Sequence, residues 1–457
     1  MPTVLWFRRD LRLADHPALL AAVRQSGDDE VVPLFVVDPR LWTSSGTPRL
    51  ARLVASLRAL DEGLDGRLLL RRGEAASVVP AVVRETGAAA VHVTAATEPY
   101  GRRRDDRVEE ALDVPLVRTG SPYAVGPGLL RTRQGTPYTV FTPFRTAWLD
   151  HGWAAPASTA TAVRWADVDG RSTVDDLEVP GAAPQVGGAG EEWARARWRD
   201  FLDTALPRYA TDRDRPERDG TSRLSAALKL GEVHPRTLLA DLTAAGPDAA
   251  AGAAVFRSQL AWREFHADVL WHRPDAAHRS LRPVVGDDEW ASGADADAAF
   301  EVWTTGRTGY PLVDAGMRQL LTTGWMHNRV RMVTASFLVK DLHLDWRRGA
   351  AHFMAHLVDG DVAQNQLNWQ WVAGTGYDAA PYVRVLNPVL QAQRFDPDGA
   401  YVHRWVPELR DVPAPAVHEP WTLGDQVPAS YPARVVDHAT ERRATLEAYR
   451  RGRPARS

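Results

Sequence analysis

The first 120 residues alternate short apolar runs with stretches in which apolar residues recur every three or four positions. The apolar runs cover residues 4–7, 31–37, 67–70, 90–93 and 114–117. The stretches between them, 17–25, 50–62, 76–86 and 102–112, have helical spacing. Strands that alternate with helices predict an α/β domain built on a five-stranded parallel sheet, doubly wound, with helices on both faces.

From residue 191 onward the pattern is helical and strand signals are few. Helices are predicted at 191–206, 236–244, 250–271, 294–304, 313–322, 326–338, 350–358 and 361–372. Between the two regions the chain is rich in Pro, Gly, Ala, Ser and Thr, as in a linker. We therefore predict an α/β domain at 1–130, a linker at 131–190 and a large all-α domain at 191–457.

The segment 359–371, DGDVAQNQLNWQW, carries the most unusual pattern. On a helix, Asp361, Asn365 and Trp369 lie on one stripe, because residues four apart share a face. Trp371 lies on another stripe, so the two indoles are expected to have different neighbours. A buried aromatic helix would explain the pattern as well, except that buried polar groups need partners.

Composition excludes several classes of functional site. The net charge is −3, so any DNA-binding surface must be local. The chain has no cysteine, which excludes disulfides, thiolate-bound iron–sulfur clusters and thiol catalysis, and fits a cytoplasmic protein. Neither an export signal nor an apolar run long enough to span a membrane is present, and the histidine spacing predicts no metal site.

Three further segments carry candidate chemistry. Residues 220–225, GTSRLS, combine backbone N–H groups, hydroxyls and a guanidinium, which suit a phosphate; an ordinary helix N-cap is the alternative. Residues 259–265, QLAWREF, place a tryptophan beside an ion pair that a protein core would also explain. Residues 324–332, GWMHNRVRM, place Asn328, Arg331 and Met332 on one helical face.

These three segments, the segment 359–371 and five others, WFRRDLR, FTPF, TGYPLVDAGMRQL, ASFLVKDL and DAAPYVRVLNP, form an ordered set of nine motifs. The set resembles the photolyase/cryptochrome family, and most closely class I cyclobutane pyrimidine dimer photolyases. The resemblance covers nearly the whole chain and is weakest at 150–190 and in the last thirty residues. It implies an enzyme, a deoxyribodipyrimidine photo-lyase that repairs UV-damaged DNA by light-driven electron transfer from reduced FAD. A blue-light photoreceptor of the cryptochrome type is the alternative.

By the same resemblance, FAD lies in the helical domain. The residues expected to hold it are Tyr209, Thr221, Ser222, Arg223, Leu224, Ser225, Arg263, Asn328, Arg331, Asp359, Gly360, Asp361 and Asn365. Asn365 is expected near the flavin N5, and Asp359 is expected to pair with Arg331. The residues expected to conduct electrons to the flavin, from the outermost inward, are Trp290, Trp346 and Trp369.

The resemblance also implies that a pyrimidine dimer leaves the duplex and enters a cavity, since photolyases are base-flipping enzymes. Trp262 and Trp371 are the expected stacking walls. The other residues expected to contact DNA are Arg213, Gln259, Asn328, Arg329, Met332 and Arg384. At position 259 the nearest relatives carry a glutamate that contacts the dimer, so Gln259 departs from the pattern and puts the repair efficiency in question.

A second, light-harvesting pigment is the last expectation from the resemblance. Relatives that bind methenyltetrahydrofolate carry an Asn-Glu pair where Tyr100 and Gly101 stand. The run from Glu98 to Gly101 resembles the deazaflavin-binding group instead, with Arg49 as a further contact. The resemblance therefore favours 8-hydroxy-5-deazaflavin over the folate, and it implies a monomer.

Overall fold

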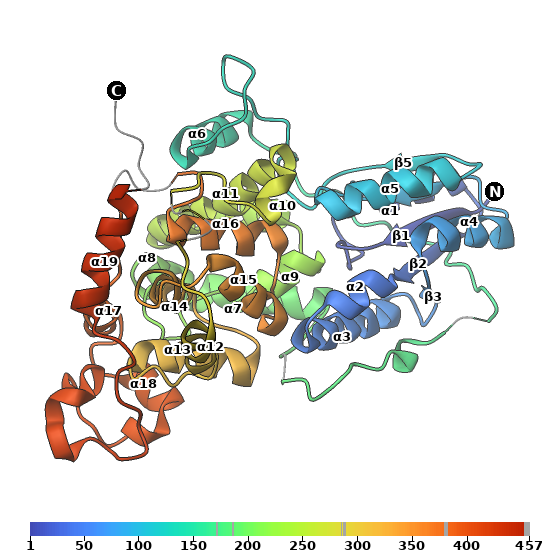
Figure 1. Ribbon diagram of the computed structural model, residues 1–457. Helices are drawn as coiled ribbons and strands as arrows, with labels where there is room; N and C mark the ends of the chain where they lie inside the picture. The colour runs from blue at the N-terminus through green and yellow to red at the C-terminus, as the bar shows by residue number, and fades with distance from the viewer. Residues whose placement is uncertain (171, 185–186, 285, 287–288, 379–382, 452–457) are drawn as a thin grey trace. The chain divides into compact units, whose positions relative to one another are not determined.

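The computed structural model describes residues 1–170, 172–184, 187–284, 286, 289–378 and 383–451 (Figure 1). The chain forms two compact units. The first contains residues 1–209, 222–274 and 358–363, and the second contains 210–221, 275–357 and 364–457. The predicted domain bounds stay predictions.

The first unit holds a parallel sheet of five strands in the order β3-β2-β1-β4-β5. The strands are β1 (Thr3–Phe7), β2 (Val31–Val37), β3 (Leu69–Arg72), β4 (Val91–Val93) and β5 (Leu116–Arg118). The predicted sheet is confirmed, although β3 begins and ends two residues later than the apolar run. It extends through Arg71 and Arg72 because their backbones pair with β2, and an edge strand tolerates polar side chains there.

The helices of the first unit are α1 (Pro17–Ser26), α2 (Pro39–Ser44), α3 (Thr47–Gly63), α4 (Ala75–Thr86), α5 (Pro99–Ala111), α6 (Phe141–His151), α7 (Glu191–Thr204), α9 (Ser225–Leu230), α10 (Pro235–Ala244) and α11 (Ala250–His272). The sequence did not predict α2, α6 or α9. The helix α6 begins inside the predicted linker, because Pro143 stands in its first turn, where proline is tolerated.

Two apolar clusters confirm that helices cover both faces of the sheet. On one face, Leu5 and Phe7 of β1 pack in a cluster with residues of α1 and α3. On the other, Val4 and Trp6 pack in a cluster with residues of α4 and α5. Successive residues of a strand point to opposite faces, so a short, fully apolar strand supplies both clusters.

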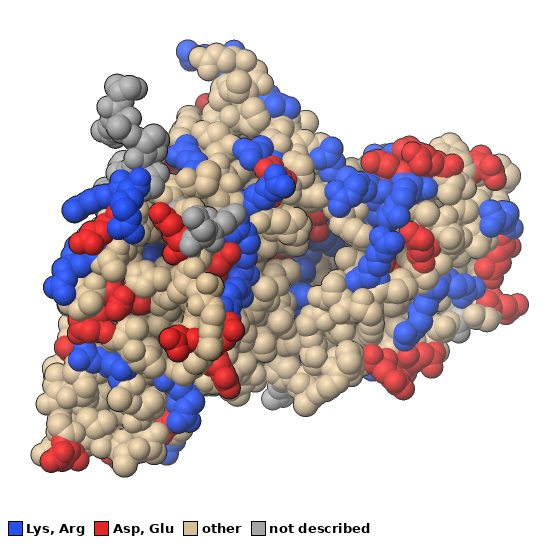
Figure 2. Space-filling view, in the orientation of Figure 1, with Lys and Arg blue, Asp and Glu red and all other residues tan. Residues whose placement is uncertain are grey.

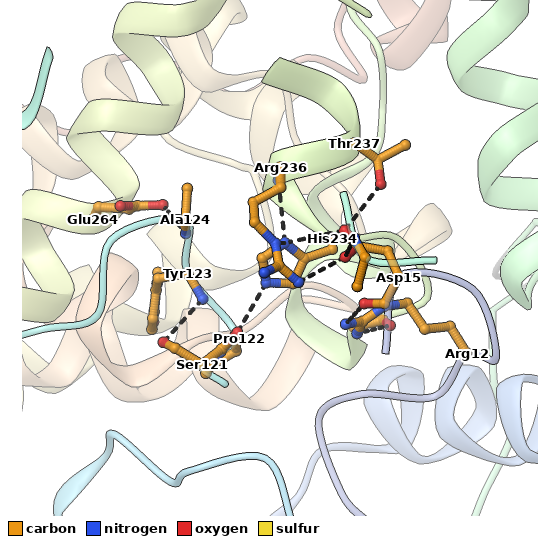
Figure 3. A network of polar contacts seen from close by, with 12 residues as sticks. Arg12, Asp15, Ser121, Pro122, Tyr123, Ala124, His234, Arg236, Thr237 and Glu264 are labelled. Carbon is orange, nitrogen blue, oxygen red and sulfur yellow. Dashed lines mark hydrogen bonds and ion pairs between the residues drawn. The ribbon is translucent and has the colours of Figure 1, made fainter. Parts of the chain in front are cut away.

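Polar contacts within the first unit tie α10 and α11 to the α/β part (Figure 3). Arg236 of α10 forms an ion pair with Asp15, at 2.6 Å between Nη2 and Oδ1. His234, before α10, lies 2.8 Å from the carbonyl oxygen of Ser121. Glu264 of α11 accepts hydrogen bonds from the backbone of residues 124 and 125. These buried contacts explain why helices beyond residue 222 belong to the first unit.

The second unit contains α12 (Ala294–Thr304), α13 (Pro311–Thr323), α14 (Asn328–Lys340), α15 (Trp346–His356), α17 (Pro388–Phe395), α18 (Ala400–Trp405) and α19 (His438–Arg451). Two of the unit boundaries fall within α8 (Tyr209–Asp212) and α16 (Val362–Ala373). The described residues of this unit include no strand, which confirms the helical prediction. The helix α15 begins at Trp346, four residues earlier than predicted, because Asp345 caps it by accepting from the Arg347 N–H at 2.9 Å.

Acidic and basic side chains are interspersed over the face shown in Figure 2, which agrees with the small net charge. No helix among the described residues is long and apolar enough to cross a membrane.

Candidate functional site

The turn that precedes α9 has the backbone of an anion cradle. Arg223 has a positive φ of 53°, uncommon for a residue with a side chain, and Leu224 follows with φ −87° and ψ 5°. Consecutive residues of left- and right-handed conformation turn their N–H groups toward one point and form a concavity that binds anions. The Leu224 N–H also donates to the Ser222 hydroxyl at 3.4 Å. The predicted phosphate site at 221–225 therefore has a suitable backbone.

Tyr209 and Arg263 are held by other parts of the first unit. The ring of Tyr209 contacts Phe201 and Phe256, at 5.4 Å between ring centroids in both cases. The Arg263 guanidinium donates to the carbonyl oxygens of Pro122 at 3.2 Å and of Leu228 at 3.1 Å. Arg263 thus joins α11 to α9, and a contact from it to phosphate stays a prediction.

A partly buried charge cluster surrounds the segment 359–361 in the first unit. Arg9 bridges two carboxylates, since it pairs with Glu98 and also donates to Asp361 at 2.6 Å. Lys229 donates a hydrogen bond from Nζ to the carbonyl oxygen of Gly360. Burial is the main cause that lowers the pKa of Lys229 to about 8. Neither Arg9 nor Lys229 was among the residues predicted to form the site.

Arg49 differs from the other residues of this cluster because one of its buried nitrogens has no acceptor among the described residues. Burial lowers its pKa to about 10, although the carboxylate of Asp359 opposes the shift. Its Nη1 is buried, and no residue that the structure describes accepts a hydrogen bond from it. A buried donor of this kind normally has an acceptor, so Arg49 has the chemistry to meet an anionic oxygen.

The second unit brings three predicted residues of α14 together. The side chains of Asn328 and Arg329 both approach the Met332 sulfur, at 4.0 Å and 3.8 Å. Arg331, on the same helix, donates from Nε to the carbonyl oxygen of Met326 at 2.8 Å. The predicted pair between Arg331 and Asp359 joins residues of different units and stays a prediction.

Two of the arginines expected to hold DNA phosphates meet the same acid. Arg329 forms an ion pair with Asp214 at 2.8 Å, and Arg213 lies 3.9 Å from the same carboxylate. A phosphate that approaches Arg329 must therefore compete with Asp214. The third arginine, Arg384, is exposed, and its guanidinium lies 5.8 Å from the centre of the Trp371 ring. A predicted phosphate contact and a predicted stacking wall are thus neighbours.

The two tryptophans of α16 have different surroundings, as predicted. Trp371 is partly exposed and donates from Nε1 to the carbonyl oxygen of Asp378 at 3.2 Å. Trp369 is buried, with its ring edge-on to Phe353 at 5.0 Å and to Trp303 at 6.2 Å. Trp303 was not among the predicted electron carriers, and its position beside Trp369 depends on packing that its sequence context does not reveal.

The Trp369 ring lies against α15 where that helix has a glycine. A Cβ at Gly349 would stand 2.2 Å from Cη2 of Trp369, so only glycine permits this approach. Trp346 lies three residues earlier on α15, and residues three apart share a face. Trp346 is fully buried and donates to the Ser280 hydroxyl at 3.1 Å, whereas Trp290 is only partly buried. All three predicted carriers pack in one apolar cluster.

Asn365 is buried, and its amide nitrogen is occupied. Nδ2 donates to the carbonyl oxygen of Ala350 and to Oε1 of Gln366, both at 3.0 Å. This orientation presents the side-chain oxygen as the acceptor that Asn365 can offer to a ligand.

Trp262 lies on α11 in the first unit and is partly exposed. Its indole stacks on Phe141 of α6, with 3.7 Å between the ring centroids and 10° between the planes. Gln259, also partly exposed, precedes it by three residues on the same helix.

Comparison with known proteins decides the family. A model described as DNA photolyase matches residues 3–162, and one described as FAD binding domain of DNA photolyase matches residues 256–451. The chain is 45% identical to a deoxyribodipyrimidine photo-lyase of Streptomyces griseus, over 97% of this chain and 98% of that one. The chain belongs to the DNA photolyase family.

Solved structures of photolyases agree. A bacterial class III photolyase from Agrobacterium tumefaciens matches with a TM-score of 0.89 and 35% identity, over 99% of this chain and 97% of that one. A photolyase from Sulfolobus tokodaii with two FAD molecules matches with a TM-score of 0.84 and 29% identity, over 99% of this chain and all of that one. The family, the fold and the enzyme class predicted from the sequence are confirmed, whereas the class I assignment stays a prediction.

The predicted site residues all lie among the described ones, but residues 379–382 of the DAAPYVRVLNP motif lie outside them. The FAD-binding domain that the family model matches contains seven of the residues expected to hold FAD. These are Arg263, Asn328, Arg331, Asp359, Gly360, Asp361 and Asn365.

Proposed function

We propose that this photolyase splits cyclobutane pyrimidine dimers in DNA, and that the predicted residues act in the roles given below. The observation that carries the proposal is the 45% identity to a photo-lyase over nearly the whole of both chains. When bound and reduced, FAD supplies on illumination the electron that opens the cyclobutane ring.

The chain's part in holding FAD begins at the turn 221–225. The left-handed turn at Arg223, together with the hydroxyls of Thr221 and Ser222, would supply a donor set that fits a diphosphate. Asn328, Arg331 and Asn365 would contact the ring system. Asn365 would accept a hydrogen bond through its side-chain oxygen, because Ala350 holds its nitrogen.

The DNA contacts divide into two kinds. Trp262 and Trp371 are partly exposed aromatic residues, and each would receive a base of the flipped dimer. Stacking of a base on an aromatic side chain contributes roughly 1–3 kcal/mol, which offsets much of the few kcal/mol that flipping costs. Arg384 would bind a phosphate beside Trp371. Arg329 would contribute less, since Asp214 already neutralises it.

Trp290, Trp346 and Trp369 would conduct electrons from the surface to the buried site. The partly exposed Trp290 fits the outer position, and the two buried indoles fit the inner ones. The close approach at Gly349 supports electron transfer between α15 and Trp369.

For the second pigment we propose 8-hydroxy-5-deazaflavin, held by Arg49 and Glu98. The support is the buried Nη1 of Arg49, a donor without an acceptor among the described residues, which would meet the acidic hydroxyl of this pigment. The solved structure of the Sulfolobus tokodaii photolyase has two FAD molecules, which supports a second pigment in this protein. Pigment released from protein made in a deazaflavin-producing host should be this compound, and recovery of a folate would contradict the proposal.

The test of repair uses the purified, reduced enzyme and an oligonucleotide with one thymine dimer. Blue light should restore the absorbance of the thymines, while a sample kept in the dark and an undamaged oligonucleotide should not change. A flavin that responds to light without restoring the thymines would instead identify a photoreceptor. Light scattering of the purified enzyme without DNA should give about the 50.4 kDa of one chain, because we propose a monomer.

A further inference from the structure

One face of the Trp262 indole, a proposed stacking wall, is already covered by Phe141. Phe141 of α6 lies parallel to the Trp262 indole at 3.7 Å, whereas its contact with Phe265 is edge-on at 6.0 Å. Phe141 is 8% exposed, while Trp262 remains partly open to solvent. An aromatic ring has two faces, so a stack on one of them directs any further partner to the other.

The helix α6 is fixed against α11 at three points. Phe141 contacts Trp262, Phe144 contacts Phe265 at 5.2 Å, and Trp148 donates from Nε1 to Glu264 at 2.6 Å. The three residues of α6 follow one another at spacings of three and four, so they form one face of the helix. Figure 1 shows α6 beside α11, in the upper part of the view.

Glu264 makes this attachment rigid. Its carboxylate accepts from Trp148 of α6, from the backbone N–H of Ala124 at 2.6 Å and from that of Val125 at 2.9 Å. The residue is buried and lies two positions after Trp262 on α11. The orientation of Phe141 relative to Trp262 is therefore set by contacts to residues two and three positions after the indole on α11.

We propose that Phe141 is a positioning residue for the lesion: it holds the Trp262 indole in the orientation in which its free face stacks on the flipped pyrimidine dimer. The proposal rests on the function proposed above for Trp262. A partly exposed tryptophan without support would lose rotamer freedom on binding, and that loss weakens affinity. With Phe141 behind it, the indole is ordered before the dimer arrives.

Phe144 shows that this contact differs from ordinary core packing. It belongs to the same helix and the same motif, FTPF, and is buried as well. Its ring contacts Phe265 with tilted geometry and Tyr138 edge-on, and among the described residues it stacks parallel to no partly exposed ring. Phe144 is therefore the matched control for Phe141.

The experiment compares Phe141→Leu, Phe144→Leu and Trp262→Ala as FAD-loaded enzymes in the dark. For each, the Kd is measured for a thymine-dimer duplex and for the same duplex without the dimer. Phe141→Leu should lower the preference for the dimer by about 2- to 10-fold, the range that an aromatic pair contributes. Phe144→Leu should keep the preference of the wild type, and Phe141→Tyr, which retains the ring, should restore it. In steady-state repair, Phe141→Leu should raise KM far more than it lowers kcat.

Each result has one meaning. If Trp262→Ala loses the preference and Phe141→Leu keeps it, the positioning role is wrong and the stacking wall stands. If Trp262→Ala also keeps it, the proposed function of Trp262 fails. An equal loss in Phe141→Leu and Phe144→Leu would show a general packing effect, and stronger dimer binding by Phe141→Leu would show that Phe141 occupies the face meant for the lesion. Either would overturn the inference.

Discussion

Replacing Gly349 by alanine tests the proposed electron pathway where Trp369 lies against α15. The added Cβ would stand 2.2 Å from Cη2 and 2.6 Å from Cζ3 of Trp369. Carbon atoms rest at about 3.5–4.0 Å, so the indole must retreat by roughly 1 Å or more. The same Cβ would also lie 2.7 Å from Cδ2 of Leu338, so the new methyl group cannot avoid the indole by shifting toward Leu338.

The effect on stability should be small compared with the effect on electron transfer. Overpacking costs about 1–3 kcal/mol. Alanine in a helix gains roughly 1 kcal/mol over glycine, so the net destabilisation of Gly349→Ala should be about 0–2 kcal/mol. The displaced indole, however, is the one that faces α15, the helix that carries Trp346.

The assay follows bleaching of oxidised FAD under blue light with an external reductant. Gly349→Ala should slow this photoreduction several-fold, while repair by chemically reduced enzyme should stay close to that of the wild type. Gly316→Ala is the matched control, because its Cβ would stand 2.4 Å from Cγ1 of Val330. That position is another buried helical glycine of the second unit, and neither its Cβ contacts nor its helix includes a proposed electron carrier.

Two results would refute this reasoning. One is equal slowing by Gly349→Ala and Gly316→Ala, which would indicate loosened packing. The other is normal photoreduction by a Gly349→Ala enzyme with a lowered melting temperature, which would show that the ring moved without affecting electron transfer.

Three further predictions follow from the same structure. Trp369→Phe should abolish photoreduction of oxidised FAD yet spare repair by prereduced enzyme; loss of both would contradict a conducting role. Trp371→Ala should weaken binding of a dimer-containing duplex by about 1–3 kcal/mol and leave undamaged DNA almost unaffected, so equal losses in a binding titration would argue against a stacking wall. Burial raises the pKa of Glu264 from 4.5 to about 7, so the folded chain holds this proton more tightly than the unfolded chain does. Stability from this group is therefore lost as the pH rises from about 4.5 to 7, by at most about 3 kcal/mol. The melting temperature of the wild type relative to Glu264→Gln should fall from pH 5 to pH 8, and a constant difference would contradict the buried acid.

The sequence by itself determined the five strands, most of the longer helices and the family. Fully apolar runs such as Val31–Val37 mark buried parallel strands, because such strands are covered on both faces. The 3.6-residue period alone predicts the helix of the DGDVAQNQLNWQW segment. It also predicts that Trp369 and Trp371 have different surroundings. The ordered motifs identified the photolyase family, since they combine spacing and residue type over nearly the whole chain.

Element ends were decided by contacts that periodicity does not contain. Asp345 begins α15 at Trp346 by capping it, and pairing with β2 extends β3 through two arginines. The helix α6 was predicted as linker because its surroundings are rich in proline and small residues, but three aromatic side chains attach it to α11. Burial against another element outweighed local composition there.

Only the tertiary structure decided which side chains meet. Arg9 and Asp361 are 352 positions apart in the chain, Arg52 and Glu232 are 180 apart, and Phe141 stands 121 residues before the indole it covers. Short-range patterns report which face of an element is buried, but a contact between distant elements depends on how the whole chain packs. For that reason the sequence identified Trp262 and Arg49 as candidates. The fold added that Phe141 stacks on Trp262 and that Nη1 of Arg49 is buried without an acceptor among the described residues.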